Sequence, residues 1–435
     1  MEVAKYIEPY VEAYRRLAAE PELWLKEMRE AAITQFALIG FPETRQENWR
    51  HTELSRLTGY TFATARDYPL DDADIAEIQS HYHDIDGGAR LVFVNGWLHD
   101  ELSTLGRLPD AVVISSLSNA REALGAEIDE HLANYACYDR HAFIQLNTAF
   151  MTDGLFLKIP DGVELEPPVQ LIFYSKSEDA PSINHPRNLI ILGKSARATV
   201  VETYIGSPDA VYLANPVTEI DLAENAALDH YKIQLESGAA FHMATIQARQ
   251  ARDSRMRQTA INNGALIMRN DLGSVMIGEG GDCKFFGLYL PQGEQHMDTH
   301  SRLDHAAPHC TSTELYKGVL DDRATGVFNG KIDVRRGAQK TDAVQSNHAL
   351  LLTDEARVNA RPQLEIYADD VKCTHGATAG EPDTDALYYL QTRGIDKETA
   401  KAMIIAAFAS EIIEEIAVDA VRERIQQIVW DRFLP

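Results

Sequence analysis

Short turn-like segments recur at regular intervals along the middle of this chain and limit the folds that it can adopt. One series occupies residues 193–196, 223–226, 252–255 and 278–281, so its starts lie 30, 29 and 26 residues apart. A second series, at 236–239 and 262–265, repeats after 26 residues. Two interleaved series with a shared spacing indicate a chain that winds in coils, which is typical of a β-solenoid. A large β-sandwich is the alternative that the spacing leaves open.

Helical patterns lie on both sides of this β-rich segment. Residues 2–40 carry apolar side chains at intervals of three and four, which predicts helices. Near the other end, Asp383 and Asp396 each precede an apolar repeat and are typical helix caps. We therefore expect three domains: an N-terminal helical domain at 1–90, a β-helix core at 91–376 with a helical insert at about 117–135, and a C-terminal helical domain at 377–435.

The charge of the chain argues against several classes of partner. It contains 66 Asp and Glu against 41 Lys and Arg, a formal net charge of −25. Binding to nucleic acid or to an anionic membrane requires clustered Lys and Arg, so we expect neither partner. The N-terminal residues lack the pattern of a signal peptide, and no apolar run approaches the roughly 20 residues of a membrane span. These features predict a cytoplasmic protein.

The cysteines do not form a recognisable metal motif or disulfide framework. Cys137, Cys283, Cys310 and Cys373 are far apart, without the CxxC spacing of a zinc ribbon. We expect reduced thiols, as in a cytoplasmic protein.

One short segment resembles part of a nucleotide site. Gly193-Lys194-Ser195 is similar to the end of a P-loop, but Asn188 stands where that motif needs its first glycine. We interpret the segment as a solenoid turn and expect this chain to bind no nucleotide.

A dense group of histidines follows in the second half of the chain. His296, His300, His305, His309 and Cys310 fall within 15 residues, and such ligands can bind zinc, iron or copper. On a strand, however, His296 and His300 share a face while His305 points away. Solvent-facing or stacked solenoid positions explain the group more simply, and any role for it stays open.

Carbohydrate-cleaving enzymes also use parallel β-helices, with carboxylates clustered on one face. The pairs Asp321-Asp322 and Asp369-Asp370 are adjacent residues, which point to opposite sides of a strand. This interpretation is therefore a remote alternative.

Cys373-Thr374-His375 is the sharpest local feature. On an extended strand, Cys373 and His375 point the same way and offer a thiolate and an imidazole to one metal or sulfur species. Two ligands do not complete a tetrahedral site, so further ligands must come from elsewhere in the fold or from another chain. Taken alone, Cys373 is more simply interpreted as a buried structural cysteine.

The residues around this feature resemble a known family. Residues 362–378 read PQLEIYADDVKCTHGAT, which resembles the C-terminal signature of SufD, a subunit family of the Suf iron–sulfur cluster assembly machine. Further similar motifs are Thr44-Arg-Gln-Glu47, Trp49-Arg50, Thr52, Phe143-Ile-Gln-Leu-Asn147, Asp153-Gly154, Ile159-Pro160, Val327-Phe-Asn-Gly330, Lys340-Thr-Asp342 and Asn347-His348. The run His375-Gly376-Ala377-Thr378 favours SufD over its paralogue SufB, and Thr374 stands where Ser is common.

The resemblance implies a right-handed parallel β-helix between two helical domains. It also implies a scaffold subunit that is not itself an enzyme, a heterodimer with SufB through the β-helices, and SufC ATPase docking on the C-terminal helices. A transient iron–sulfur cluster would form at the SufB–SufD interface, where His375 and Cys373 match the functional positions of the family. SufB would supply the missing ligands. We expect His375 to matter more than Cys373, which is either a ligand or structural.

Two further expectations follow from the resemblance. ATP-driven dimerisation of SufC would move the C-terminal helices and reshape the subunit interface. A purely architectural subunit, with all the cluster chemistry in SufB, is the alternative. The exposed strand edge of a β-helix end also invites a homodimer of the isolated chain.

Overall fold

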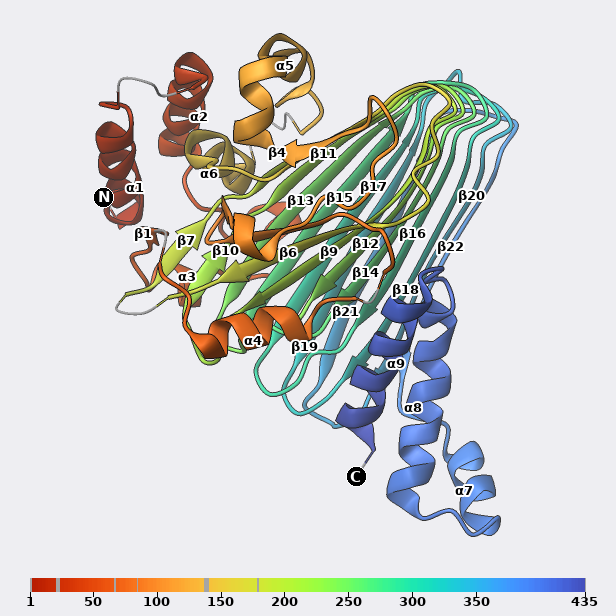
Figure 1. Ribbon diagram of the computed structural model, residues 1–435. Coiled ribbons are helices and arrows are strands. Elements are labelled where there is room, and N and C mark those ends of the chain that lie inside the picture. Colours follow the sequence, from red (N-terminus) through yellow and green to blue (C-terminus); the bar gives the residue numbers. More distant parts are fainter. Residues whose placement is uncertain are drawn as a thin grey trace.

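Two long sheets, parallel except where β3 and β4 join them, face each other and form the centre of the molecule (Figure 1). The computed structural model describes residues 2–20, 24–65, 68–83, 85–136, 141–177 and 180–434. The first sheet contains, in spatial order, β21 (Arg357–Ile366), β19 (Thr325–Val334), β17 (His296–His305), β15 (Ile267–Met276), β13 (Phe241–Gln250), β11 (Val217–Leu222), β8 (Arg187–Leu192), β5 (Leu155–Ile159) and β4 (Val113–Ser116). The short strands β1 (Ala63–Thr64), β7 (Ser182–Asn184) and β10 (Tyr212–Ala214) join this sheet beside the main path.

The second sheet is built from the strands that alternate with these along the chain. Its spatial order is β22 (Lys372–Gly380), β20 (Asp342–Leu351), β18 (Thr311–Leu320), β16 (Asp282–Tyr289), β14 (Arg255–Asn262), β12 (Ala227–Gln234), β9 (Arg197–Gly206), β6 (Val169–Ser175), β2 (Arg90–Val94) and β3 (Trp97–Leu98). Each coil thus adds one strand to each sheet, and successive coils pair in parallel. This arrangement confirms the parallel β-helix and excludes the β-sandwich.

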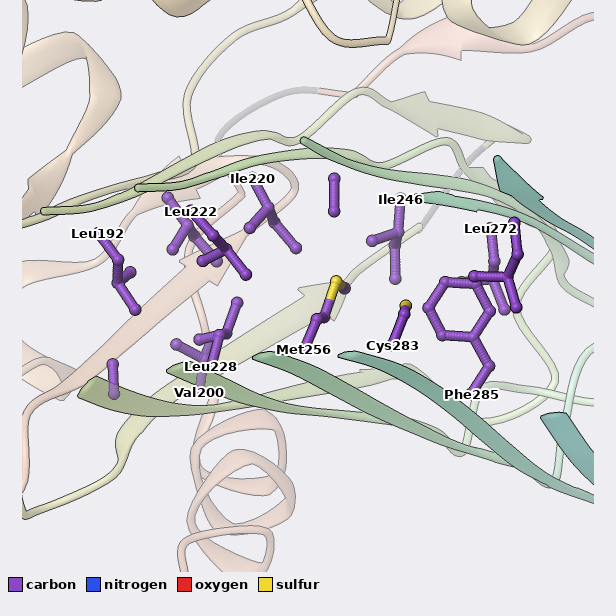
Figure 2. Packing of buried hydrophobic residues seen from close by; sticks show 14 of the residues in the cluster. Leu192, Val200, Ile220, Leu222, Leu228, Ile246, Met256, Leu272, Cys283 and Phe285 are labelled. Atoms are coloured by element: carbon purple, nitrogen blue, oxygen red, sulfur yellow. The ribbon is translucent and has the colours of Figure 1, made fainter. Parts of the chain in front are cut away.

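Parallel register stacks equivalent side chains of successive coils inside the β-helix. Ile190 pairs with Ile220, and Ile220 pairs with Ala248, so one row of side chains runs along the first sheet. Figure 2 shows side chains of this sheet, among them Leu222 and Leu272, facing those of the second sheet, such as Met256. The core therefore lies between the sheets.

Left-handed residues end the strands at the turns that the sequence predicts. Ser195, Asn225 and Asp253 have φ of 55°, 57° and 57°, and each donates its backbone N–H to a carbonyl of the next turn. The Gly193-Lys194-Ser195 segment is thus a solenoid turn, as predicted. The turns stack with the coils and repeat the same backbone conformation at each step.

Helices cover the outside of the β-helix (Figure 1). The N-terminal half contains α1 (Glu2–Leu17), α2 (Lys26–Ile39), η1 (Glu47–Trp49), α3 (Ser55–Thr58), α4 (Asp72–Ser80), η2 (Asp100–Leu102), α5 (Leu117–His131) and α6 (Ala142–Phe150). Helix α5 matches the predicted insert, with non-helical angles at Leu124. Helices α1, α2 and α6 share an aromatic core with the outer face of the first sheet, including Tyr10, Phe36 and Phe241.

The C-terminal helices are α7 (Thr384–Thr392), α8 (Lys397–Ile413) and α9 (Asp419–Phe433). Asp383 and Asp396 cap α7 and α8, as predicted, by accepting backbone N–H bonds. Helices α8 and α9 pack on the outer face of the second sheet, where Ile405 and Ile412 join a cluster with Ile261 and Phe286. The apolar stripe therefore serves the β-helix as well as its own helices.

The predicted domain limits at 90 and 376 stay predictions. Strand β1 joins the first sheet from within the first 90 residues, and β22 continues to Gly380. Within the described ranges, no helix is both long and apolar enough to cross a membrane.

Candidate functional site at the open end of the solenoid

The terminal strand of the second sheet carries both of the residues that the sequence singles out. Cys373 and His375 lie on β22, which pairs with β20 on one side and ends the order of the sheet. No further described strand covers the other edge of β22. The backbone groups of that edge are therefore available to another chain.

Register shows where the two side chains point. Cys373 pairs with Ala343 and His375 pairs with Gln345, and both partners on β20 are fully buried between the sheets. Neighbours in register on a parallel sheet point to the same side. Cys373 and His375 thus both face the interior of the β-helix, at its uncovered last coil.

The two groups differ in their surroundings. His375 is exposed, whereas Cys373 is partly buried and packs against the main core. Burial, and then the negative charge of Asp342, raise the pKa of the Cys373 thiol. The isolated chain therefore favours a neutral thiol at Cys373, while the imidazole of His375 remains accessible as a metal ligand.

Polar side chains occupy the register positions of His375 in the two preceding coils and form a row with it. Gln345 is fully buried and donates from Nε2 to Glu314, which occupies the next position along the row. Burial raises the pKa of Glu314 to about 7, against the lowering effect of hydrogen bonds from Gln345 and Ser301. Sequence inspection did not find Gln345 or Glu314, because their relation to His375 depends on register across about 30 residues per coil.

The donor set at this end is incomplete. Among the described residues, no group of three or more His, Cys, Asp or Glu side chains is arranged to hold a metal ion. Cys373 and His375 have the right chemistry for iron, since thiolate and imidazole are typical ligands of iron and of iron–sulfur clusters. A complete site at this position would need ligands from a second chain.

The described side chains of the histidine group at 296–310 do not gather into a metal site. His296 and His300 lie on the outer face of β17, and His305 faces inward, 2.9 Å from the Ser312 hydroxyl. His309 occupies a left-handed turn position, and the buried Cys310 thiol lies 3.4 Å from the Gly278 carbonyl. The expected alternation of faces is confirmed. Cys137 lies outside the described residues.

The outer face of β17 instead holds the motif at 44–52. The Thr52 hydroxyl donates to the buried Asp298 carboxylate over 2.6 Å and lies 2.9 Å from His296 Nε2. Arg269 binds Asp298 and stacks on the Trp49 ring at 3.8 Å. These contacts make the motif a structural link between the N-terminal region and the solenoid, beside a polar pocket of about 210 Å³.

The C-terminal helices also have apolar side chains exposed on their surface. Tyr388 and Tyr389 on α7 are 70% and 57% exposed, and Met403 on α8 is 37% exposed. Exposed aromatic side chains that lie close together commonly mark a protein–protein contact.

Comparisons with known proteins cover nearly the whole chain. A family model described as the SufBD core domain of the SUF system of FeS cluster assembly matches residues 173–408, and one for the SufBD N-terminal region matches 1–171. A SufBD family iron–sulfur cluster assembly protein of Synechocystis is 35% identical, covering 92% of this chain and 89% of that protein. The iron–sulfur cluster assembly proteins SufD of Escherichia coli and Bacillus subtilis are 29% and 28% identical, covering 92% and 97% of this chain and 91% and 96% of theirs.

Proposed function

The chain belongs to the SufBD family of iron–sulfur cluster assembly proteins, and from this premise we propose that it is a SufD-type scaffold subunit that contributes His375 to a nascent cluster. The cluster is the cargo of the assembly and is shared with SufB. One observation carries the proposal: His375 faces inward on a terminal strand that no described strand covers. A partner docked on that end would enclose the imidazole together with its own ligands.

The open end supports pairing with SufB. Among the described strands, β21 and β22 each present one unpaired edge, and exposed apolar side chains occur on these last coils: Val344 on β20, Ile366 at the end of β21 and Tyr367 directly after it. Covering these groups would satisfy backbone hydrogen bonds and remove apolar surface from water. The same edge would allow the isolated chain to form a homodimer, which SufB would displace.

The uncovered face of α7 and α8 supports docking of SufC. Tyr388, Tyr389 and Met403 offer an apolar surface at the end of the molecule away from the N-terminal helices (Figure 1). Because the only P-loop-like segment is a solenoid turn, we assign ATP hydrolysis to SufC and a non-enzymatic role to this chain.

Contacts between α8 and the second sheet would transmit a displacement of this helix to the strands. Lys317 on β18 pairs with Glu411 of α8 and donates to the Phe408 carbonyl over 3.0 Å. Strand β18 pairs with β20, and β20 pairs with β22 on its other side. Displacement of α8 by dimerising SufC subunits would therefore act on the strands next to His375 and open or reshape the junction with SufB.

His375 would act through one ring nitrogen. A neutral imidazole has one nitrogen with a lone pair, and that nitrogen can bind iron at pH 7. Cys373 would either add a thiolate once iron lowers its pKa or remain a packing residue.

The test is His375→Ala in the co-purified complex with SufB and SufC, followed by anaerobic reconstitution with iron and sulfide. We expect the complex to form and cluster absorption to fall at least about tenfold, because even residues that only support metal ligands typically contribute about 10–100-fold to metal affinity. His348→Ala is the matched control, since His348 lies on β20 with its ring bonded to Thr378 on the outer side. Equal cluster formation in all three proteins would leave this chain an architectural subunit.

The architectural alternative is favoured by the incomplete donor set and by the raised thiol pKa of Cys373. It predicts normal cluster yield from the His375→Ala complex. Membership of the SufBD family removes the reason for considering a carbohydrate-active enzyme.

A further inference from the structure

Two buried polar side chains behind His375 have no part in the function proposed so far. Gln345 and Glu314 are both fully buried, and Gln345 Nε2 donates to a Glu314 oxygen. The Gln345 Oε1 atom has no hydrogen-bond partner in the described structure. A buried acceptor without a partner lowers the stability of the fold, so the orientation of the Gln345 amide calls for an explanation.

The hydrogen bond to Glu314 fixes which way the amide of Gln345 points. The Glu314 oxygen that faces Gln345 accepts from Nε2, and an accepting oxygen at this position selects the NH₂ group of the amide. Gly330, on the facing strand β19, leaves room for this arrangement, because a Cβ atom there would lie 2.3 Å from Gln345 Nε2. Because Nε2 already donates to Glu314, Oε1 is the amide atom that can accept a hydrogen bond from another donor.

The next position along this row is His375. It pairs in register with Gln345, and neighbouring strands are separated by about 4.8 Å. The two described side chains are not hydrogen bonded in the isolated chain, in which His375 is exposed to water. Covering the open end would remove that water and leave Gln345 Oε1 as the acceptor nearest to His375 in the row.

We propose that Gln345 is a positioning residue for His375. In the assembled complex, one ring N–H of His375 donates to Gln345 Oε1, and Glu314 holds the amide in the orientation that accepts it. The lone pair of the other ring nitrogen then faces the junction, where iron binds. Metal-binding histidines commonly donate their second ring nitrogen to a carbonyl or carboxylate oxygen, which fixes the tautomer and strengthens the ligand. This inference rests on the proposed role of His375.

The test compares complexes of this chain with SufB and SufC, using Fe²⁺ alone as the probe. Gln345→Met keeps a long buried side chain but removes the acceptor. We expect Fe²⁺ to bind about 10–100-fold more weakly than to the wild-type complex. In a second sample, reconstituted with iron and sulfide, pulsed EPR of the reduced cluster should show an altered coupling from the remote ring nitrogen of His375. A merely structural role would leave that coupling unchanged.

A swapped double variant, Glu314→Gln with Gln345→Glu, provides the matched control. It exchanges the donor and the acceptor between the two positions, so a carboxylate oxygen still faces His375 and the internal hydrogen bond is kept. We expect Fe²⁺ affinity within about threefold of wild type. It also tests the proposal if Gln345→Met fails to fold, since loss of Fe²⁺ binding in the swap would contradict the inference.

Two outcomes separate this inference from the function on which it rests. Unchanged Fe²⁺ affinity and unchanged nitrogen coupling in Gln345→Met, together with loss of both in His375→Ala, would overturn the role of Gln345 and keep that of His375. Unchanged Fe²⁺ affinity in His375→Ala would overturn both.

Discussion

The environment of a side chain decides what it can do at the open end of this solenoid. Cys373 and His375 face the same way, yet burial keeps the thiol of Cys373 neutral and leaves the imidazole of His375 ready to bind a metal. Their spacing in the sequence predicted that they share a face, and the register agrees. The sequence could not indicate their unequal burial, because that depends on the last coil being uncovered.

Cys373→Ala tests this difference directly. Since the thiol has a raised pKa and packs against the core, we expect the variant to lose about 1 kcal/mol of stability and to keep most cluster formation. Chemical denaturation of the isolated chain and reconstitution of its complex measure the two effects. Loss of the cluster as complete as in His375→Ala would identify Cys373 as an essential ligand.

Glu314 should make the stability of the chain depend on pH. Its pKa rises from 4.5 to about 7 on folding, so the folded state holds the proton more tightly than the unfolded state. The stabilisation from the protonated form is complete below pH 4.5 and is lost as the pH rises through 7. The shift corresponds to about 3 kcal/mol.

Glu314→Gln removes this titration. At pH 5 we expect the free energy of unfolding of the variant to equal or fall below that of the wild type. At pH 8 we expect it to exceed the wild-type value by up to about 3 kcal/mol. Urea denaturation of both proteins at the two pH values measures the difference. If the gap between them does not change with pH, the carboxyl group of Glu314 does not titrate as the fold requires.

The turns are the elements that the sequence predicted best. Their spacing predicted the coils, and the structure shows why the turns recur. Each turn has a left-handed residue at the same position: Ser195, Asn225 and Asp253 in successive turns. Asn and Asp tolerate this conformation and are easily recognised in a sequence. Helix α6 (Ala142–Phe150) was not predicted, because its residues are almost all buried and show no polar face.

Asn225→Val should destabilise the β-helix by about 1–2 kcal/mol. A β-branched residue is strained at a φ of 57°, and the variant also loses the bond from Asn225 to the Ser195 hydroxyl. Asn225→Gly is the control that keeps the turn conformation accessible, with an expected change of a few tenths of a kcal/mol. Equal losses in both variants, measured by chemical denaturation, would show that the side-chain bond matters and the backbone angle does not.

At the scale of the whole molecule, the two uncovered surfaces should bind different partners independently. Ala377 faces the interior of the last coil, in register with the buried Asn347, whereas Tyr388 lies on α7. We expect Ala377→Lys to weaken SufB pairing at least about tenfold, because it places an unpaired charge in the covered end. SufC binding should be unchanged.

Tyr388→Ala should have the opposite effect. We expect it to weaken SufC binding and to leave SufB pairing intact, because Tyr388 belongs to α7 rather than to the edge strand β22 and its side chain is 70% exposed. Calorimetric titration with each purified partner measures both affinities. Loss of SufB pairing in Tyr388→Ala, or of SufC binding in Ala377→Lys, would contradict the separation of the two surfaces.

The order of the strands also sets how fast amide protons exchange along the solenoid. Interior strands have neighbours on both sides, whereas β22 pairs with β20 alone among the strands that the structure describes. Backbone N–H groups on the free edge of β22 should therefore exchange with deuterium sooner than those of β12 or β14, since local opening needs the fewest contacts to break there. A subunit docked on this end would convert this edge strand into an interior one. Deuterium uptake at residues 372–380 thus reports the occupancy of the open end in the unmodified protein.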